Sequence, residues 1–510
     1  MKQKCMTMLM ALVLLVGLLA GCGSNEADQS SDDGVQGTME ANSYAETSDE
    51  EIYHAIFTLM VPSEQPDIDK IQDAINEITI PAINVEVELL PVTWSGYYSQ
   101  IPMMLAANEQ IDILPALQSS IATYVGSEYI MDLKELLVDN APYITQLYSE
   151  DDLLACSYNG FYYGIPNTSE YCFPIGYIMR TDCLEKVGID VDTIKTLDDM
   201  TEVFEKVQAA YPDMLMLADS AAANIITRSQ NGSFGDLMGT AYVVLEGTAQ
   251  EPVVKNLYET DMLRTACEHQ RLWYEAGYIA KDAATVQDTN ETLMKAGNTF
   301  AFSCTIKPGV EAEKNAQVGY DTTSVKLYDD VVTSGSTNGL VYCVGSGSKR
   351  PDKAVQLLDL IISSHELCDL LNWGIEGEHW ELQEDGTIDY PEGVTAENCG
   401  YHNSMGFAYP NQFNSYVWKG TDPDIFNQYM EVRDAAYVSI AYGFTADVTD
   451  YMDSIAVMDS LIAEYRPQIG TGSVDVESTL NELNEKLYEA GMQELIDGVQ
   501  QQLDEWLAAK

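Results

Sequence analysis

The chain has 510 residues, of which 46% are apolar, and it carries 25 basic against 81 acidic side chains, a formal net charge of −56. The apolar content is that of an ordinary globular protein, while a surface this acidic repels nucleic acid and anionic lipid headgroups. We therefore expect no nucleic-acid partner. The acidic residues are dispersed along the chain, which favours a general effect on solubility over one specific cationic partner.

The first 21 residues have the pattern of an export signal. Lys2 and Lys4 precede an apolar run from Leu9 to Leu19, which is too short to be a comfortable permanent transmembrane helix. The run closes on Leu19-Ala-Gly-Cys22, which resembles the lipobox of bacterial lipoproteins. The resemblance implies cleavage before Cys22, lipidation of its thiol, and a mature protein anchored to the extracellular face of the cell membrane. An ordinary secretory signal with a chance cysteine is the alternative.

Residues 22–51 predict a disordered acidic linker, because they contain almost no large apolar side chains that could offset the entropy of an ordered chain. The folded body is expected to begin near Ile52. Residues 52–510 are too many for one average domain and favour two lobes. No later segment combines the length and apolarity of a transmembrane helix.

The body opens with alternating strand and helix patterns. Residues 55–60, 85–89 and 111–114 have the apolar patterns of strands, and Val85, Val87 and Leu89 alternate with glutamates, as in a strand with one wet face. Apolar residues at helical spacing lie between the strands. A βαβαβ order of this kind predicts a mostly parallel sheet covered by helices.

Later helices have recognisable starts. Thr196-Leu-Asp-Asp199 resembles a capping box with Asp in place of the usual Glu, and Pro351 opens a strongly apolar helical segment. The C-terminus has helical spacing of apolar residues over 480–487 and again over 492–506. We therefore expect a helical C-terminal module.

Ten cysteines are scattered along the chain without a CxxC pair, which excludes zinc-ribbon and thioredoxin motifs. Cys5 belongs to the signal and Cys22 to the lipobox. Apolar neighbours favour free buried thiols for the other eight, although an exported protein could oxidise some of them. These eight are Cys156, Cys172, Cys183, Cys267, Cys304, Cys343, Cys368 and Cys399.

The common catalytic motifs are missing. The sequence contains no GxSxG, GxxxxGK[ST], HExxH or GxGxxG, and its five histidines have no metal-ligand spacing. A carboxylate pair suited to glycoside hydrolysis could form in space, but no sequence feature singles one out. We expect no catalytic residue, metal or cofactor.

Aromatic residues are abundant, with 31 tyrosines and 6 tryptophans, and many lie in short polar stretches such as Thr93–Tyr98, Tyr158–Tyr163 and Tyr409–Phe413. A flat ring can stack on the C–H face of a sugar while neighbouring amides and hydroxyls pair with the sugar hydroxyls. This pattern favours a carbohydrate ligand, although most single rings are expected to belong to the core or the ordinary surface.

Nine motifs spread over the body are shared with a known family: Tyr162–Pro166, Gly176–Asp182, Thr196–Asp199, Leu293–Phe302, Lys349–Leu360, Leu371–Trp380, Tyr390–Gly393, Asn411–Trp418 and Leu503–Leu507. Together they resemble a family 1 extracellular solute-binding protein of an ABC importer. The resemblance covers nearly the whole mature chain, and its later motifs point to the LipO-like lipoprotein branch, which carries a C-terminal domain of unknown function. Near Trp94 the chain departs from that branch.

The resemblance implies an α/β, two-lobe, periplasmic-binding-protein-like fold of type II with a hinge between the lobes. We expect lobe 1 over 52–168 plus 289–345, and lobe 2 over 169–288 plus 346–510. The implied function is a monomeric, non-enzymatic receptor that captures an oligosaccharide between the lobes and delivers it to the permease of an ABC importer. A surface lipoprotein that binds or hydrolyses glycosides and a structural or adhesive lipoprotein are the alternatives.

By their positions at lobe edges and crossings, eight residues are predicted to contact the ligand. The aromatic ones would stack on sugar rings and the amides would pair with hydroxyls. For Trp373 a packing role in the C-terminal module is an equal alternative. The eight residues are Trp94, Tyr97, Gln118, Tyr171, Asn338, Trp373, Asn411 and Gln412.

Overall fold

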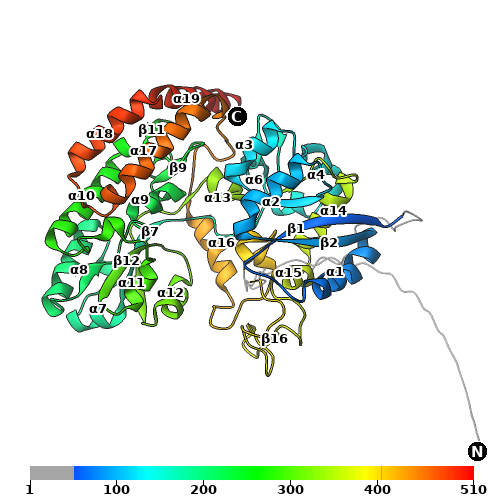
Figure 1. Cartoon of the computed structure of the whole chain (residues 1–510), viewed down its shortest axis with the longest axis horizontal. Helices are drawn as coiled ribbons and strands as arrows, with labels where there is room; N and C mark the ends of the chain where they lie inside the picture. Colours follow the sequence, from blue (N-terminus) through cyan, green and yellow to red (C-terminus); the bar gives the residue numbers. More distant parts are fainter. Residues whose placement is uncertain (1–50, 404) are drawn as a thin grey trace, which may run out of the picture. The chain divides into compact units, whose positions relative to one another are not determined.

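The computed structural model describes residues 51–403 and 405–510 (Figure 1). The predicted signal peptide, Cys22 and nearly all of the predicted linker lie outside the described residues. Within the described ranges, no helix has the length and apolarity needed to cross a bilayer.

The first lobe is built on a five-stranded sheet with the order β2-β1-β3-β15-β6. β1 runs parallel to β2 and β3, whereas β15 runs antiparallel to β3 and β6. The predicted βαβαβ start is confirmed, and β2 alternates between buried and exposed residues as its sequence indicates. The strands are β1 (Tyr53–Val61), β2 (Val85–Thr93), β3 (Ile113–Leu117), β6 (Ile165–Pro166) and β15 (Leu340–Val344).

The second lobe contains a mixed sheet with the order β13-β7-β12-β8 and a separate antiparallel sheet with the order β11-β10-β9. β7 lies antiparallel to both of its neighbours, and β12 is parallel to β8. The strands are β7 (Ile175–Arg180), β8 (Leu215–Leu217), β9 (Gly235–Leu237), β10 (Val243–Glu246), β11 (Val254–Asn256), β12 (Thr299–Thr305) and β13 (Thr322–Lys326).

Helices cover the first sheet and bury one apolar stripe each. In α1 the buried stripe includes Ile71 and Ile75, which recur at the predicted spacing. The helices with this lobe are α1 (Ile68–Ile83), α2 (Trp94–Ala106), α3 (Gln118–Gly126), α4 (Lys134–Asn140), α5 (Ile144–Leu147), α6 (Glu150–Ala155), α14 (Pro351–Ser363) and α15 (His365–Asn372).

The second lobe has helices of its own. The capping box predicted at the start of α8 is confirmed, because Thr196 and Asp199 each accept a hydrogen bond from the backbone N–H of the other. The helices are α7 (Thr181–Val187), α8 (Leu197–Ala210), α9 (Ile225–Arg228), α10 (Asp261–Ala276), α11 (Asn290–Lys295), α12 (Val310–Val318), α17 (Met452–Gly470), α18 (Val476–Glu489) and α19 (Met492–Ala509).

The predicted lobe boundaries are wrong in two places. β12 and β13, expected in lobe 1, belong to the second sheet. α14 and α15, expected in lobe 2, pack into the first core together with Tyr401, Met405, Ala408 and Tyr409 (Figure 1). The sequence pattern of a buried element shows that one face meets a core but does not say which core. With these elements assigned by the structure, the chain crosses between the lobes three times. The C-terminal helices α17–α19 do pack into the second lobe, as predicted.

The three crossings run through residues 167–174, 331–339 and 425–443, which include α13 (Ser334–Asn338) and α16 (Ile425–Ala435). They meet in a small cluster that contains Tyr171, Val332 and Tyr442. Arg433 of α16 pairs with Asp152 of the first lobe at 2.9 Å. Its guanidinium also lies over the Tyr171 ring, 4.3 Å from the ring centroid. We call Asp152, Tyr171, Arg433 and Tyr442 the hinge cluster.

All eight body cysteines are free, and seven of them are buried. This agrees with the expectation of small core residues. Burial raises the pKa of the Cys172 thiol to about 12, so this thiol stays protonated at neutral pH.

Candidate functional site

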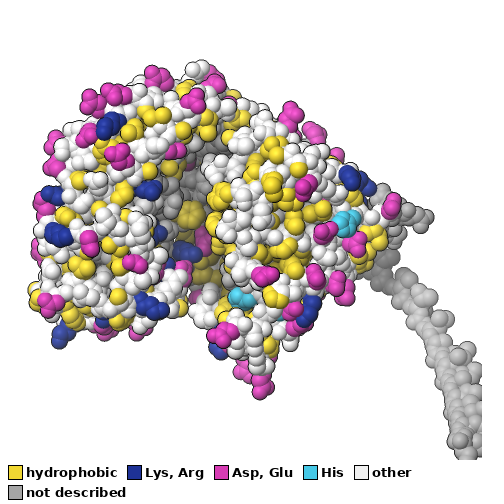
Figure 2. Space-filling view, viewed as in Figure 1, with side chains coloured by type: hydrophobic (Ala, Val, Ile, Leu, Met, Phe, Trp, Pro, Cys, Tyr) yellow, Lys and Arg dark blue, Asp and Glu magenta, His cyan; other side chains and the backbone are white. Residues whose placement is uncertain are grey.

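The candidate site is a cleft of about 580 Å³ between the lobes, within the range of about 300–1,000 Å³ that is common for ligand pockets. Figure 2 shows it as a hollow with apolar, acidic and basic side chains on its wall. It is lined from the first lobe by Trp94, Leu117, Leu340 and Phe407, from the joining segments by Asn167, Ser169, Glu170, Phe173, Gly335, Ser336 and Gly339, and from the second lobe by Arg228, Cys304, Thr305, Lys307, Val310, Glu313 and Lys314.

Strand ends place the wall residues. β2 ends at Thr93 immediately before Trp94, β3 ends at Leu117, and β12 ends at Thr305. In α/β sheets, ligands commonly bind just beyond the carboxyl ends of strands. The topology therefore brings the ends of strands from two sheets to one cleft.

An aromatic pair forms the rim of the cleft on the first lobe. Trp94 is the first residue of α2, whose start is fixed by Thr93 Oγ1 accepting the N–H of Gly96. Its ring meets that of Phe407 edge to face, with 6.3 Å between centroids. Trp94 is 41% exposed and Phe407 47% exposed, so both keep free ring surface. Large exposed rings beside a cleft are suited to stacking on a flat ligand.

The second lobe contributes charged groups. Lys307 Nζ lies 2.7 Å from Glu170 and 3.7 Å from Glu313, and Lys314 Nζ lies 3.0 Å from Glu313. Burial disfavours the charged form of Glu170, but the charge and hydrogen bond of Lys307 outweigh it and lower the pKa of this carboxyl. The Glu170 carboxylate is therefore held as an anion beside Lys307.

A second hollow of about 250 Å³ extends the cleft along the hinge. It shares Phe173, Gly335 and Ser336 with the main cleft, and Gln118 forms part of its wall. The two hollows together make a groove longer than the main cleft, which suits an elongated ligand.

Another hollow, of about 610 Å³, lies away from these strand ends and is bordered by Asp182, Glu185 and Asp321. Its one aromatic side chain, Tyr320, already has the Arg180 guanidinium 4.0 Å from its ring centroid. The groove between the lobes is therefore the better candidate site.

Three of the eight predicted residues lie at or beside the groove. Trp94 is on the main rim, and Gln118 is on the wall of the extension. Gln412 lies behind the wall, where its amide nitrogen is 3.3 Å from a carboxylate oxygen of Glu170. Position at a strand end was the signal that identified Trp94 and Gln118.

Three other predicted residues are placed in the interior instead. Tyr97 is 1% exposed, and its hydroxyl accepts the N–H of Leu117 at the end of β3. Tyr171 lies in the hinge cluster. Asn338 is 1% exposed and donates to the carbonyl of Ala155, which ties α13 to the first lobe.

The last two predicted residues stabilise the segment after α15. Trp373 donates through Nε1 to the carbonyl of Tyr416 and packs against the rings of His402 and Trp418, which supports its packing role. Asn411 is buried, and its amide donates to the carbonyl of Ile362. Neither residue lines the groove.

Several residues that line the cleft are not among the eight predicted ones: Phe407, Phe173, Arg228 and the Glu170–Lys307 pair. Phe173 lies two residues after the predicted Tyr171 in the first crossing, so the segment was identified but not the side chain that faces the groove. Phe407 comes from a short 3-10 turn (Gly406–Ala408), and no periodic pattern marks it.

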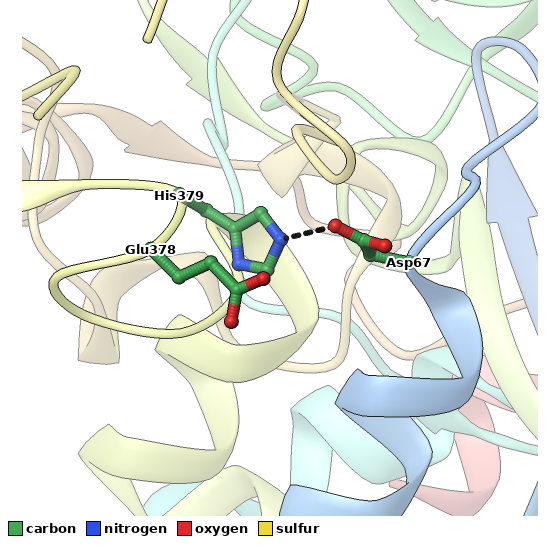
Figure 3. Close-up of side chains that lie close together, drawn as sticks. All are labelled: Asp67, Glu378 and His379. Atoms are coloured by element: carbon green, nitrogen blue, oxygen red, sulfur yellow. Dashed lines mark hydrogen bonds and ion pairs between the residues drawn. The ribbon is translucent and has the colours of Figure 1, made fainter. Parts of the chain in front are cut away.

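One acid–histidine group in the described residues has the spacing of metal ligands: Asp67, Glu378 and His379 (Figure 3). His379 Nδ1 accepts the N–H of Ile375, so Nε2 carries the proton and donates to Asp67 at 3.3 Å. The Lys70 ammonium pairs with both Asp67 and Glu378 and already supplies a positive charge. The group therefore ties the start of α1 to the loop after α15.

The chain matches two family models. Residues 73–373, more than half of the chain, match the model of the bacterial extracellular solute-binding proteins. Residues 440–508, which include α17–α19, match a domain of unknown function.

Individual relatives cover nearly the whole chain. A carbohydrate ABC transporter substrate-binding protein of Streptococcus pneumoniae serotype 4 is 24% identical over 456 residues, covering 88% of this chain and 90% of that protein.

Among solved structures, the N-glycan transport solute-binding protein NgtS of Streptococcus pneumoniae is similar with a TM-score of 0.76 and 20% identity, covering 89% of this chain and 99% of that one. A human-milk-oligosaccharide (HMO) binding, ABC-transporter-associated protein of Bifidobacterium longum infantis gives a TM-score of 0.61 at 14% identity, covering 90% and 100%. These likenesses confirm the predicted two-lobe fold. With the match over residues 73–373, they lead to one conclusion: the chain belongs to the family of bacterial extracellular solute-binding proteins.

Proposed function

We propose that this protein is the receptor of an ABC importer and captures an oligosaccharide in the groove between its lobes. The observation that carries the proposal is the rim pair Trp94–Phe407, whose free ring faces border a cleft that also presents Asn167, Ser169 and Ser336. Rings beside amide and hydroxyl groups match the two faces of a sugar. The relatives named for carbohydrate transport support the same ligand class.

Capture would work by closure of the lobes on the ligand. The segments that join the lobes line the groove, so a ligand that contacts Phe173 and Ser336 touches the hinge as well as both walls. Hinge closure around a ligand is the known behaviour of periplasmic binding proteins. The closed protein would then deliver its ligand to the permease.

The carboxylates of the groove favour a receptor over a glycosidase. A glycosidase needs one carboxyl group with a raised pKa to protonate the leaving oxygen. Here the pKa of Glu170 is lowered, and Glu313 lies 3.0 Å from Lys314 Nζ. Glu170 is therefore not prepared to act as a general acid, which supports a role in binding without turnover.

The proposal is tested by thermal unfolding with a panel of plant, mucin-type and N-glycan oligosaccharides. A ligand that binds only the folded protein stabilises it by about 2.7 kcal/mol at one hundred times its dissociation constant. We expect a subset of the panel to raise the melting temperature and to be recovered unchanged by chromatography. Release of reducing sugar by the pure protein would instead support the glycosidase.

The membrane anchor is part of the proposal. Lipidation of Cys22 would hold a monomeric receptor on the extracellular face of the membrane, since acyl chains contribute about 0.8 kcal/mol for each buried CH₂. Cys22→Ala is expected to release the protein or to leave an uncleaved precursor, as measured by detergent partitioning and mass. A variant that still partitions as the mature lipidated form would contradict the lipobox assignment.

A further inference from the structure

The lining of the main cleft is richer in basic residues than the chain as a whole. The whole chain has 25 basic and 81 acidic residues. The cleft is lined by three basic residues, Arg228, Lys307 and Lys314, and two acidic ones, Glu170 and Glu313. Figure 2 shows basic side chains at the hollow of a surface that is otherwise rich in acids. A local excess of cations inside an acidic protein indicates a ligand with negative charge.

Two of the three cations are already neutralised. Lys307 pairs with Glu170 at 2.7 Å, and Lys314 pairs with Glu291 at 2.9 Å and with Glu313 at 3.0 Å. Their charge is therefore largely compensated within the protein. Arg228 is the basic lining residue for which no such ion pair is present among the described residues.

Arg228 has few partners for a guanidinium with five N–H donors. Among the described residues it makes no ion pair within 4.0 Å, and its hydrogen bond runs from Nη2 to the carbonyl of Ser303 at 3.3 Å. Its Nε is covered and has no partner. A partly buried, under-paired guanidinium attracts an anion more strongly than a fully hydrated one does.

Arg228 is held in place and its charge is only partly compensated: it favours the ionised forms of Asp219 and Glu291, but neither carboxyl group forms an ion pair with it within 4.0 Å. Ser303, which accepts from Arg228, donates its own N–H and hydroxyl to the buried Asp219 at 3.1 and 2.7 Å. Asp219 also accepts from the amide of Gln270 at 2.9 Å. The carboxylate of Asp219 is thus hydrogen-bonded to Ser303 and Gln270, and the guanidinium is positioned as part of the wall.

We propose that Arg228 binds an anionic group of the ligand, so that the captured oligosaccharide is acidic, carrying a carboxylate or a sulfate. This inference rests on the proposed carbohydrate function and narrows its substrate class. A planar guanidinium can form two parallel hydrogen bonds to a carboxylate or sulfate, and charge-assisted bonds of this kind are stronger than those to a neutral hydroxyl. The rings of Trp94 and Phe407 would bind the sugar, and Arg228 its charge.

The test compares saccharides that differ only in charge. Tri-galacturonate is titrated against its methyl ester, 3′-sialyllactose against the methyl ester of its carboxylate, and a sulfated disaccharide against its unsulfated form. The carboxylate and sulfate arms distinguish the two anion types. We expect at least one acidic member to bind about 10- to 100-fold more tightly than its neutral partner, as charge-assisted hydrogen bonds suggest.

Variants assign the effect to one side chain. Arg228→Gln should abolish the preference for the acidic saccharide while leaving weak binding of both saccharides. Arg228→Lys should retain part of that preference, because lysine keeps the positive charge but cannot form the two parallel hydrogen bonds of a guanidinium. Lys206→Gln is the matched control, since Lys206 is an exposed cation of the same lobe outside the groove. Melting temperatures without ligand show whether each variant is folded.

The outcomes separate this inference from the proposed function. Tighter binding of the neutral partners, or a preference for acids that survives in Arg228→Gln, overturns the inference and leaves an oligosaccharide receptor. Failure of every saccharide, charged or neutral, to bind overturns both. A preference that is lost only on changing Arg228 supports the inference.

Discussion

Trp94 and Trp373 differ in what their indole rings contact. Trp94 meets one neighbouring ring, that of Phe407, and is 41% exposed on the rim of the cleft. Trp373 donates its indole N–H to the carbonyl of Tyr416, and its ring packs against those of His402 and Trp418. The first ring is available to a ligand, and the second is used by the fold.

Trp94→Ala is therefore expected to weaken oligosaccharide binding at least tenfold with little change in the melting temperature of the free protein. The loss of a stacking partner of this size corresponds to about 1.4 kcal/mol or more. Titration of the wild type and the variant with the same oligosaccharide provides the measurement. Tyr437→Ala, which removes an exposed ring away from the groove, is the matched control. Equal weakening by both changes would argue against a contact at Trp94.

Trp373→Ala should behave in the opposite way. Removing a packed indole is expected to lower the free energy of unfolding by about 3 kcal/mol, because the surrounding rings cannot fill the space. Chemical denaturation measures this loss. Binding per folded molecule should remain near that of the wild type, and a selective loss of binding at unchanged stability would show that Trp373 contacts the ligand after all.

The sequence predicts some of these residues for a physical reason. Trp94 and Gln118 follow strands whose burial pattern is clear, and strand ends meet at the cleft. Tyr97 was placed with Trp94 by proximity along the chain, but its ring is buried and its hydroxyl is bonded to the backbone of Leu117. Arg228 could not be predicted, since its importance depends on the absence of an acidic partner in space, which a sequence does not display.

At the scale of elements, the hinge cluster joins all three crossings to the first lobe. Asp152 of α6 accepts from Arg433 and Tyr442 of the third crossing, and Tyr442 also bonds to Thr337 of the second. Burial raises the pKa of Asp152, but the hydrogen bonds of Tyr442 and Ser149 and the charge of Arg433 outweigh it, so that the pKa is lowered overall. The native state thus favours ionised Asp152.

The hinge cluster predicts a pH dependence of stability. Because the folded-state pKa of Asp152 lies below its unfolded value, its stabilisation is complete above the unfolded pKa of about 4 and is lost as pH falls through the lower folded value. Asp152→Asn should therefore be less stable than the wild type at pH 7, and the difference should shrink as the pH falls below about 4. Denaturant titrations at pH 7, 5 and 3.5 measure it, and a constant difference would contradict this role.

Element type was predictable for the long periodic helices and for the early strands, whereas the choice of lobe was not. The apolar residues of α14 indicated a buried helix, and it is buried on nearly every side against α4, α15 and α1. The spacing of apolar residues along a helix indicates that the helix is buried, but it does not indicate which elements pack against it. The exchange of β12–β13 and α14–α15 between the predicted lobes follows from that limit.

At the scale of the whole molecule, the two sheets present their strand ends to one groove, and the first two crossings line it. The family match and the similar solved structures agree with this architecture. The groove combines free rings on one lobe with an under-paired cation on the other. Under the proposed function, this division would let one site bind both the ring and the charge of a saccharide.

The most direct test of this account is a calorimetric titration of the wild-type protein with the oligosaccharide that stabilises it most. We expect the protein to bind one ligand per molecule and to saturate, and Trp94→Ala to bind it at least tenfold more weakly. The saccharide should be recovered uncleaved. Binding that is unaffected by Trp94→Ala, or a steady heat of hydrolysis in place of saturation, would contradict this account.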